Sequence, residues 1–396
     1  MSLNQTPRAN RLHIGIFGKT NSGKSSLVNC LIGHEVALVS EMAGTTTDPV
    51  YKSMELHPIG PVVFIDTAGF ADNTILGKQR EKLTEDIIKK TDVAIVIFDD
   101  SDLREEAKWI KMLEDAKVSI IPVVSKADFL DRASLVLKIK QKLEIDPVII
   151  SAHEGSKTRE IVIDKIAAAI PEDYQRQTIL RNLVPEDSLV VLVMPQDIQA
   201  PKGRLILPQV QTIREVLDTR CIAVCTTVDG LERTLNALNE SPKLIITDSQ
   251  CFKEVRDMKP KESKLTSFSV LFAAYKGDIR SFINGVNAID KLDESSRILI
   301  AEACTHAPLE EDIGRVKIPA MLKKRFGANL RIDIVSGNDF PDDLSCYDLV
   351  IHCGGCMFNR KYMMNRVLDA KEQHVPMTNY GITIAYLKGI LDEVVY

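Results

Sequence analysis

Short runs of apolar, mostly β-branched residues alternate with amphipathic, helix-like stretches between residue 12 and about residue 170. The strand-like runs are HIGIF, VVFIDTAG, VAIVIF, IIPVVSKAD and PVIIS. Alternation of strands with helices is typical of a parallel sheet that helices cover on both faces. The pattern therefore predicts a first α/β domain at residues 1–171.

Two more α/β units follow this domain. Residues 171–187 contain two prolines and many charges, which predicts a linker. The runs LVVLVM, CIAVCTTV and KLIITD predict a small second unit with three strands, and the charged residues 256–264 mark its end. The runs RILIAEAC, LRIDIVSG and DLVIHCGG predict a third unit. We expect the linker and the second domain at residues 172–264 and the third domain at residues 265–396.

The first strand-like run leads directly into residues 18–25, GKTNSGKS, and a helix-like stretch follows. This is the GxxxxGK[ST] pattern of a phosphate-binding loop, in its required place between a strand and a helix. Its glycines let backbone N–H groups surround phosphates at a helix N-terminus. Lys24 would neutralise the β- and γ-phosphates, and the Ser25 hydroxyl would bind Mg²⁺. The first domain is therefore predicted to be a P-loop nucleotide-binding domain.

Three further segments come in the order and spacing of a GTPase. They are residues 45–47 (TTT), residues 66–69 (DTAG) and residues 125–128 (SKAD), and the last two follow strand-like runs. The carboxyl ends of parallel strands converge on one crevice. We expect Thr46 to reach Mg²⁺ through its hydroxyl and Asp66 to hold it through water. The Gly69 N–H would sense the γ-phosphate, which makes a switch.

The base should be guanine. Asp128 can accept two hydrogen bonds from the N1–H and N2–H₂ edge, which adenine lacks, and Ser151 with Ala152 fits the loop that contacts the base oxygen. The residues predicted to bind GTP are Gly18, Asn21, Ser22, Gly23, Lys24, Ser25, Ser26, Thr46, Asp66, Gly69, Lys126, Asp128, Ser151 and Ala152. Of these, Lys24, Thr46 and Gly69 would act in hydrolysis.

Cysteine and histidine gather in the third unit. Cys304 and His306 follow one strand-like run, and His352, Cys353 and Cys356 follow another. If these strands are near neighbours in a parallel sheet, the three thiols share one crevice, and metal or cluster binding is favoured over an inert core. Zinc and an iron–sulfur cluster both fit the spacing. Either histidine could be a fourth ligand, or a hydrogen-bonded residue behind the ligands.

At its nucleotide motifs the first domain resembles the TrmE–Era–EngA class of GTPases. That class carries an asparagine at the position of Asn21, and its switch is similar to residues 43–48, AGTTTD. The resemblance implies K⁺-stimulated hydrolysis, with Asn21 helping to bind K⁺. Ser125 stands where the class has asparagine, which lowers the expected affinity for guanine. Phe70 stands where Ras-like enzymes have a catalytic glutamine, so we expect slow hydrolysis.

The whole chain resembles the HydF family of FeFe-hydrogenase maturation GTPases. The resemblance rests on residues 200–218, residues 269–278, the CTH and HCGGCM motifs, and residues 378–381 (TNYG). It implies a 4Fe-4S cluster on Cys304, Cys353 and Cys356 with a labile fourth site, and a homodimer formed by the second domain. It also implies a scaffold or carrier for the di-iron precursor of the hydrogenase H-cluster. Two radical-SAM maturases would supply this precursor, and apo FeFe-hydrogenase would receive it.

Composition narrows the remaining choices. Lys and Arg total 50 against 55 Asp and Glu, a net charge of −5, so no global positive field exists to hold a nucleic acid. An RNA- or ribosome-associated GTPase with a structural zinc or a redox iron–sulfur site is the alternative. No run approaches the ~18–20 apolar residues of a membrane span, and residues 1–10 lack the apolar core of a signal peptide. We therefore expect a cytoplasmic protein without a membrane or nucleic-acid partner.

Overall fold

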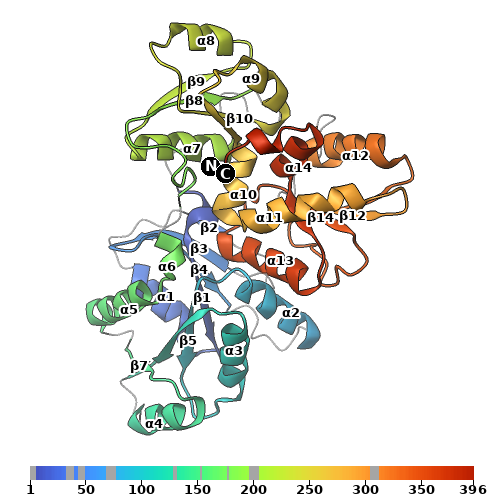
Figure 1. Cartoon of the computed structure of the whole chain (residues 1–396). Coiled ribbons are helices and arrows are strands. Elements are labelled where there is room, and N and C mark those ends of the chain that lie inside the picture. The colour runs from blue at the N-terminus through green and yellow to red at the C-terminus, as the bar shows by residue number, and fades with distance from the viewer. Residues whose placement is uncertain are drawn as a thin grey trace. The chain divides into compact units, whose positions relative to one another are not determined.

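The computed structural model describes residues 6–32, 40–42, 50–67, 77–127, 132–151, 154–175, 178–195, 205–303 and 312–396. The chain divides into two compact units, Met1–Arg176 and Gln177–Tyr396 (Figure 1). In the described part of the chain, no helix combines the length and the apolar character that crossing a membrane requires.

The first unit contains a seven-stranded sheet in the order β2-β3-β4-β1-β5-β6-β7. Its strands are β1 (Leu12–Gly18), β2 (Ser40–Met42), β3 (Val50–Leu56), β4 (Gly60–Asp66), β5 (Val93–Phe98), β6 (Ser119–Val124) and β7 (Val148–Ile149). Strands β4, β1, β5, β6 and β7 are parallel, as the pattern predicted. Strands β2 and β3 were not predicted, and each pairs antiparallel with its neighbour. The three residues between β3 and β4 are too few for a parallel crossover.

Helices cover both faces of this sheet. They are α1 (Lys24–Ile32), α2 (Gly77–Ile88), α3 (Arg104–Asp115), α4 (Arg132–Leu143), α5 (Gly155–Ala169) and the short α6 (Glu172–Gln175), and a 3₁₀ turn, Arg8–Asn10, precedes β1. Ile14 and Ile16 of β1 pack with α1 and α5 in one core, whereas Phe17 packs with α2, α3 and α4 in the other. Alternate side chains of β1 thus anchor both helical layers.

The second unit holds two four-stranded parallel sheets. The first has the order β11-β10-β8-β9, formed by β8 (Leu189–Val193), β9 (Ile222–Thr226), β10 (Leu244–Thr247) and β11 (Lys264–Ser267). Its helices are α7 (Leu207–Asp218), α8 (Leu231–Ala237), α9 (Phe252–Met258) and α10 (Phe268–Lys276). Strand β11 was not predicted, because its four residues carry no apolar run. It begins at the position where the charged stretch predicted a domain boundary.

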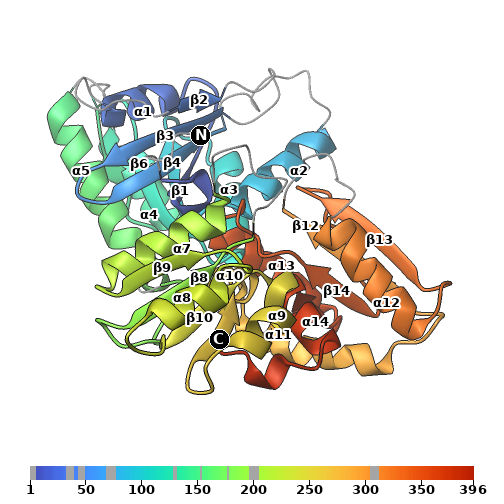
Figure 2. The same ribbon diagram turned by 90° about the horizontal axis from the view of Figure 1, so that it is seen from above.

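The second sheet has the order β13-β12-β14-β15, formed by β12 (Arg297–Glu302), β13 (Arg331–Ser336), β14 (Leu349–His352) and β15 (Met377–Asn379). Its main helices are α11 (Ile279–Val286), α12 (Ile318–Phe326), α13 (Arg360–Glu372) and α14 (Tyr380–Leu387). Helix α10 lies between the two sheets and contacts α7 on one side and α13 and α14 on the other (Figure 2). Residues of both sheets, such as Val191 and Ile351, share one hydrophobic core. The predicted fold class, a P-loop α/β domain followed by two smaller parallel-sheet α/β domains, is confirmed.

Candidate functional site

The phosphate-binding loop connects β1 to α1 and has the backbone that its sequence requires. Asn21 and Gly23 have positive φ angles, 62° and 98°, which asparagine and glycine adopt at least cost. A Cβ atom on Gly18 would lie 2.6 Å from the hydroxyl of Ser22 and 3.2 Å from the Ile97 carbonyl oxygen, so a larger residue would crowd the loop. The loop therefore turns tightly at the end of a buried strand, as phosphate binding through backbone N–H groups requires.

Lys24 is buried at the start of α1, and its ammonium group points into this loop. Its Nζ atom donates hydrogen bonds to the carbonyl oxygens of Gly18 at 2.7 Å and Lys19 at 2.5 Å. The loop thus encloses the charge that the sequence assigns to the β- and γ-phosphates.

The two magnesium-site residues that the structure describes lie together. The Ser25 hydroxyl, in the first turn of α1, donates to Oδ2 of Asp66, the last residue of β4, at 3.3 Å. A hydroxyl and a carboxylate are the oxygen ligands that Mg²⁺ prefers, so this pair fits the ion. Thr46 and Gly69 lie outside the described residues.

Residues 125–127 are the described part of the loop predicted to bind the base, called here the base-binding loop. Ser125 connects it to the phosphate-binding loop. Its buried hydroxyl donates to the Ser22 carbonyl oxygen at 2.7 Å. The next segments also converge, because Ala127 N–H donates to the carbonyl oxygen of Ile150, next to Ser151. Asp128 and Ala152 lie outside the described residues, so their contacts with guanine stay predictions.

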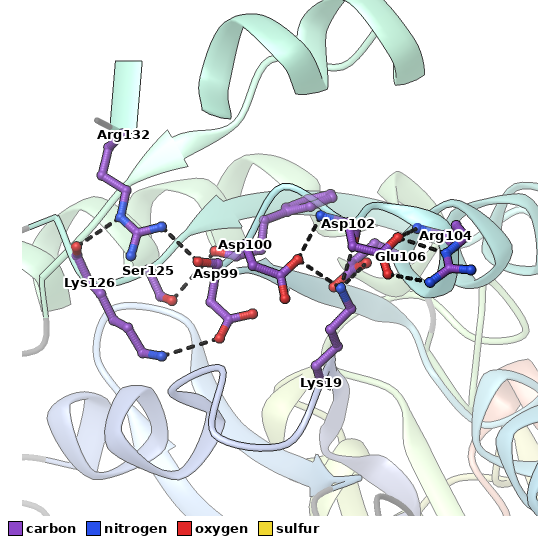
Figure 3. Close-up of polar contacts among 10 residues, drawn as sticks. Lys19, Asp99, Asp100, Asp102, Arg104, Glu106, Ser125, Lys126 and Arg132 are labelled. Carbon is purple, nitrogen blue, oxygen red and sulfur yellow. Dashed lines mark hydrogen bonds and ion pairs between the residues drawn. The ribbon is translucent and has the colours of Figure 1, made fainter. Parts of the chain in front are cut away.

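Four charged residues beside this site were not predicted from the sequence. Lys19 of the phosphate loop, Asp99 and Asp100 after β5, and Glu106 in the first turn of α3 lie close together (Figure 3). Burial raises the pKa of Glu106 to about 7, and Lys19 only partly opposes that rise. The sequence does contain one indication of this group: two consecutive carboxylates, Asp99 and Asp100, directly follow the apolar run VAIVIF.

The strands that precede the two cysteine motifs in the sequence are neighbours in the sheet. Strands β12 and β14 pair in parallel, with Ala301 opposite His352. The Cys353 sulfur accepts hydrogen bonds from the N–H groups of Ala303 at 3.1 Å and Gly355 at 3.5 Å. Ala303 directly precedes Cys304 in the sequence. The residue before the first predicted cysteine ligand therefore already contacts Cys353. Cys304 and His306 themselves lie outside the described residues.

The described residues fit a sulfur-ligated group. Gly355 turns the backbone with a φ of 63°, and both Cys353 and Cys356 are partly exposed. Backbone N–H donors to a ligating sulfur are one means by which proteins tune iron–sulfur clusters. Within the described ranges, no cluster of three or more cysteine, histidine or carboxylate side chains is arranged to hold a metal ion.

His352 is fully buried, and both of its ring nitrogens have partners. Its Nδ1 atom lies 2.8 Å from the Cys353 carbonyl oxygen, and its Nε2 atom lies 2.8 Å from a guanidinium nitrogen of Arg366. Because guanidinium only donates, Nε2 must accept and Nδ1 must carry the proton. Burial and the Arg366 charge lower the pKa of His352 to about 3. This arrangement favours support of the cysteine loop over metal ligation.

Arg366 is itself held by aromatic rings and a carbonyl group. Its guanidinium carbon lies 4.6 Å from the ring centroids of Phe340 and Phe358 and 4.8 Å from that of Tyr362. It also donates to the Gly337 carbonyl oxygen at 2.5 Å. A buried cation therefore lies directly behind the predicted cluster loop.

Three family models match successive parts of the chain. Residues 13–126 match the 50S ribosome-binding GTPase model. Residues 179–277 match the hydrogen maturase F dimerization domain, and residues 280–396 match the hydrogen maturase F tetramerization domain. The two maturase models together cover more than half of the chain.

Curated relatives match only the first part of the chain. GTPase Der of Sulfurimonas denitrificans is 36% identical over 194 residues, which are 46% of this chain and 39% of that protein. The tRNA modification GTPase MnmE of Dichelobacter nodosus is 31% identical over 176 residues, 42% of this chain and 37% of that protein. The chain thus spans about two fifths of the length of these relatives. A solved structure of Aquifex aeolicus Era is 19% identical and covers 63% of this chain and 98% of that one, with a TM-score of 0.33.

Proposed function

Because this chain belongs to the hydrogen maturase F family and begins with a P-loop GTPase domain, we propose that it hydrolyses GTP and acts as a metal-cluster scaffold. It would bind a 4Fe-4S cluster and deliver the di-iron precursor of the H-cluster to apo FeFe-hydrogenase, with two radical-SAM maturases as suppliers. The observation that carries the proposal is the presence of both a formed phosphate loop and a cysteine loop at paired strand ends.

The nucleotide half of the proposal rests on the geometry around Lys24. Lys24 would hold the β- and γ-phosphates, and Ser25 with Asp66 would hold Mg²⁺. Bound there, Mg²⁺ would neutralise phosphate charge during transfer. Asp128 would select guanine, Thr46 and Gly69 would respond to the γ-phosphate, and K⁺ beside Asn21 would speed a slow intrinsic reaction.

A single substitution tests the nucleotide half. Lys24→Ala should abolish GTP turnover, whereas Lys111→Ala, at an exposed position of α3, should leave it unchanged. Phosphate release is measured with GTP and with ATP, in Na⁺ and in K⁺. Equal turnover of ATP would refute the guanine assignment, and equal rates in both salts would refute the K⁺ role.

The cluster half rests on Cys353 and its neighbours. Cys353, Cys356 and Cys304 would ligate the cluster, which would supply an iron site open to an exchangeable ligand. The chain's own contribution is the pair of N–H groups directed at the Cys353 sulfur and the turn at Gly355.

Metal analysis tests the cluster half. Anaerobically reconstituted protein should contain iron and sulfide, and Cys356→Ala should lose the brown chromophore. Cys346→Ala is the matched control, because Cys346 is an exposed cysteine of the same unit. Stoichiometric zinc in anaerobically purified protein, or a complete cluster in Cys356→Ala, would contradict the assignment.

Self-association through the second domain is supported by the dimerization-domain match and by exposed apolar residues. Strand β9 lies at one edge of its sheet, and Ile222 on it is 57% exposed, as is Leu217 on α7. An uncovered edge with apolar side chains is readily buried against a second copy. Ile222→Arg should convert the sedimenting dimer to monomer, while Leu137→Arg, at an equally exposed leucine of α4, should not.

A further inference from the structure

Two consecutive carboxylates after β5 contact the two nucleotide-binding loops of the first unit (Figure 3). Oδ1 of Asp100 accepts a hydrogen bond from Nζ of Lys19, in the phosphate loop, at 2.9 Å. Oδ2 of Asp99 lies 3.2 Å from Nζ of Lys126, in the base-binding loop. The short segment after β5 therefore contacts both loops through two consecutive side chains.

The ammonium group of Lys19 has two hydrogen-bond acceptors and one further carboxylate nearby on the segment from β5 to α3. Besides Asp100, it donates to the backbone carbonyl of Asp102 and lies 3.6 Å from Oε2 of Glu106. Glu106 is 1% exposed, and nothing in the described part of the chain is within hydrogen-bond distance of that oxygen. Lys19 is therefore the charge that compensates a buried carboxylate.

The backbone of Lys19 connects this contact to the phosphate-binding lysine. Its carbonyl oxygen accepts the 2.5 Å hydrogen bond from Nζ of Lys24. Lys19 thus accepts a hydrogen bond from Lys24 through its backbone carbonyl, while its own side chain is held by Asp100. A displaced Lys19 side chain would move a carbonyl that positions the phosphate lysine.

We propose that Lys19 is a positioning residue for nucleotide phosphates, clamped by Asp100 and Glu106 on the segment between β5 and α3. The inference rests on the proposed binding of GTP by the first unit. The clamp acts on the phosphate loop and not on the base-binding loop, so its loss weakens binding only of ligands that carry phosphates. Asp99 and Ser125 continue to hold the base-binding loop.

The first test compares ligands with and without phosphates in the full-length protein. Glu106→Gln and Asp100→Asn keep side-chain size and remove charge. Glu106→Gln should weaken GDP binding about tenfold, because it removes the charge of a buried carboxylate beside Lys19. Asp100→Asn should weaken it about two- to fivefold, because the Asp100 carboxylate is half exposed. Neither substitution should change guanosine binding. Affinity is measured by calorimetry for GDP and by competition for guanosine. Arg104→Gln is the matched control, because Arg104 is exposed and pairs with the side chain of Asp102, whereas Lys19 uses the backbone carbonyl of Asp102.

A double-mutant cycle tests whether Glu106 acts through Lys19. Lys19→Met alone should weaken GDP binding about as much as Glu106→Gln, and the double variant should be less than about twofold weaker than Lys19→Met. Additive losses would show that Glu106 acts independently and would overturn the proposal. Circular dichroism and the thermal midpoint of each variant establish that it is folded.

A pH profile separates positioning from general support of the fold. The charges that act on Glu106 are Lys19 and Asp100, while Asp102 acts on Lys19 and is paired with Arg104. Protonation of Glu106 below pH 7 removes one of the two carboxylates that clamp Lys19, so wild-type affinity for GDP should fall from pH 8 to pH 6 relative to Glu106→Gln. Parallel profiles would refute the role of Glu106.

The outcomes distinguish this inference from the proposed function. Wild-type protein that binds no GDP would refute the proposed nucleotide function itself. Wild-type protein that binds GDP, together with variants that bind it equally well or lose guanosine to the same extent, would refute the clamp alone.

Discussion

Replacement of Arg366 by methionine should loosen the strand and helix that flank the cysteine loop. Arg366 is 2% exposed, and its guanidinium group donates to Nε2 of His352 and to the Gly337 carbonyl oxygen. Methionine fills much of the same volume between the three aromatic rings but donates no hydrogen bond. His352 and Gly337 would each keep a buried acceptor without a donor.

The cost follows from those two acceptors. A buried acceptor left without a donor costs about 1–3 kcal/mol, so two cost about 2–6 kcal/mol. Methionine has no charge to desolvate, and this offsets part of the cost. The net loss in stability is about 2–4 kcal/mol. Opening of the surrounding segment should then become about 30- to 1000-fold more frequent, since each 1.4 kcal/mol is a factor of ten.

Amide hydrogen exchange of the full-length protein measures this directly. Peptides that cover β14 and α13 should exchange faster in Arg366→Met by that factor, while peptides of the first unit stay unchanged. Arg325→Met is the matched control: Arg325 is 43% exposed, lies near aromatic rings and pairs with Asp290, a surface pair worth less than about 1 kcal/mol. Exchange in Arg366→Met within threefold of wild type would refute the reasoning.

Three further predictions concern other parts of the chain. Ser125→Ala removes the donor that joins the base-binding loop to the phosphate loop, so calorimetry should show GDP affinity reduced about two- to tenfold, the value of one buried hydrogen bond. Burial raises the pKa of Glu106 to about 7, so the folded state binds the proton of Glu106 more tightly than the unfolded state does. The free energy of unfolding should therefore fall by about 1–3 kcal/mol from pH 4.5 to pH 7, and by less in Glu106→Gln. Urea unfolding measures it through the fluorescence of the single tryptophan, Trp109 on α3. Gly285→Ala would place a Cβ atom 2.1 Å from a carbonyl oxygen of β15, so calorimetry should show the second unit destabilised by more than about 2 kcal/mol, whereas Gly155→Ala, with no atom within 4 Å, should show no loss.

The local features of the nucleotide site could be predicted from the sequence. A tight loop between a buried strand and a helix depends on neighbouring residues, so GKTNSGKS alone predicted the loop that the structure shows. The strand runs likewise predicted the parallel part of the first sheet, because a strand covered on both faces must be apolar throughout. The HydF resemblance came from short segments of the same local kind, and the two maturase family models match the same part of the chain.

Elements with little apolar character escaped prediction. Strands β2 and β3 are short or mixed in polarity, and β11 has four residues that start within a charged stretch. Each is a strand because a neighbouring strand supplies its hydrogen bonds, as β10 does for β11. Pairing of this kind depends on the strand that lies beside the segment in the fold. The residues of the segment itself do not identify that strand.

The roles of the buried charges were decided only by the tertiary structure. Lys19 and Asp100 are 81 positions apart, and no periodicity connects them, yet they form the contact that anchors the phosphate loop. For His352, the sequence left ligand and supporting residue as alternatives. Its burial against Arg366, with a partner on each ring nitrogen, favours the second. The physical reason is the same in both cases: a charged or polar group acquires its role from the partners that compensate its burial, and the fold alone brings those partners together.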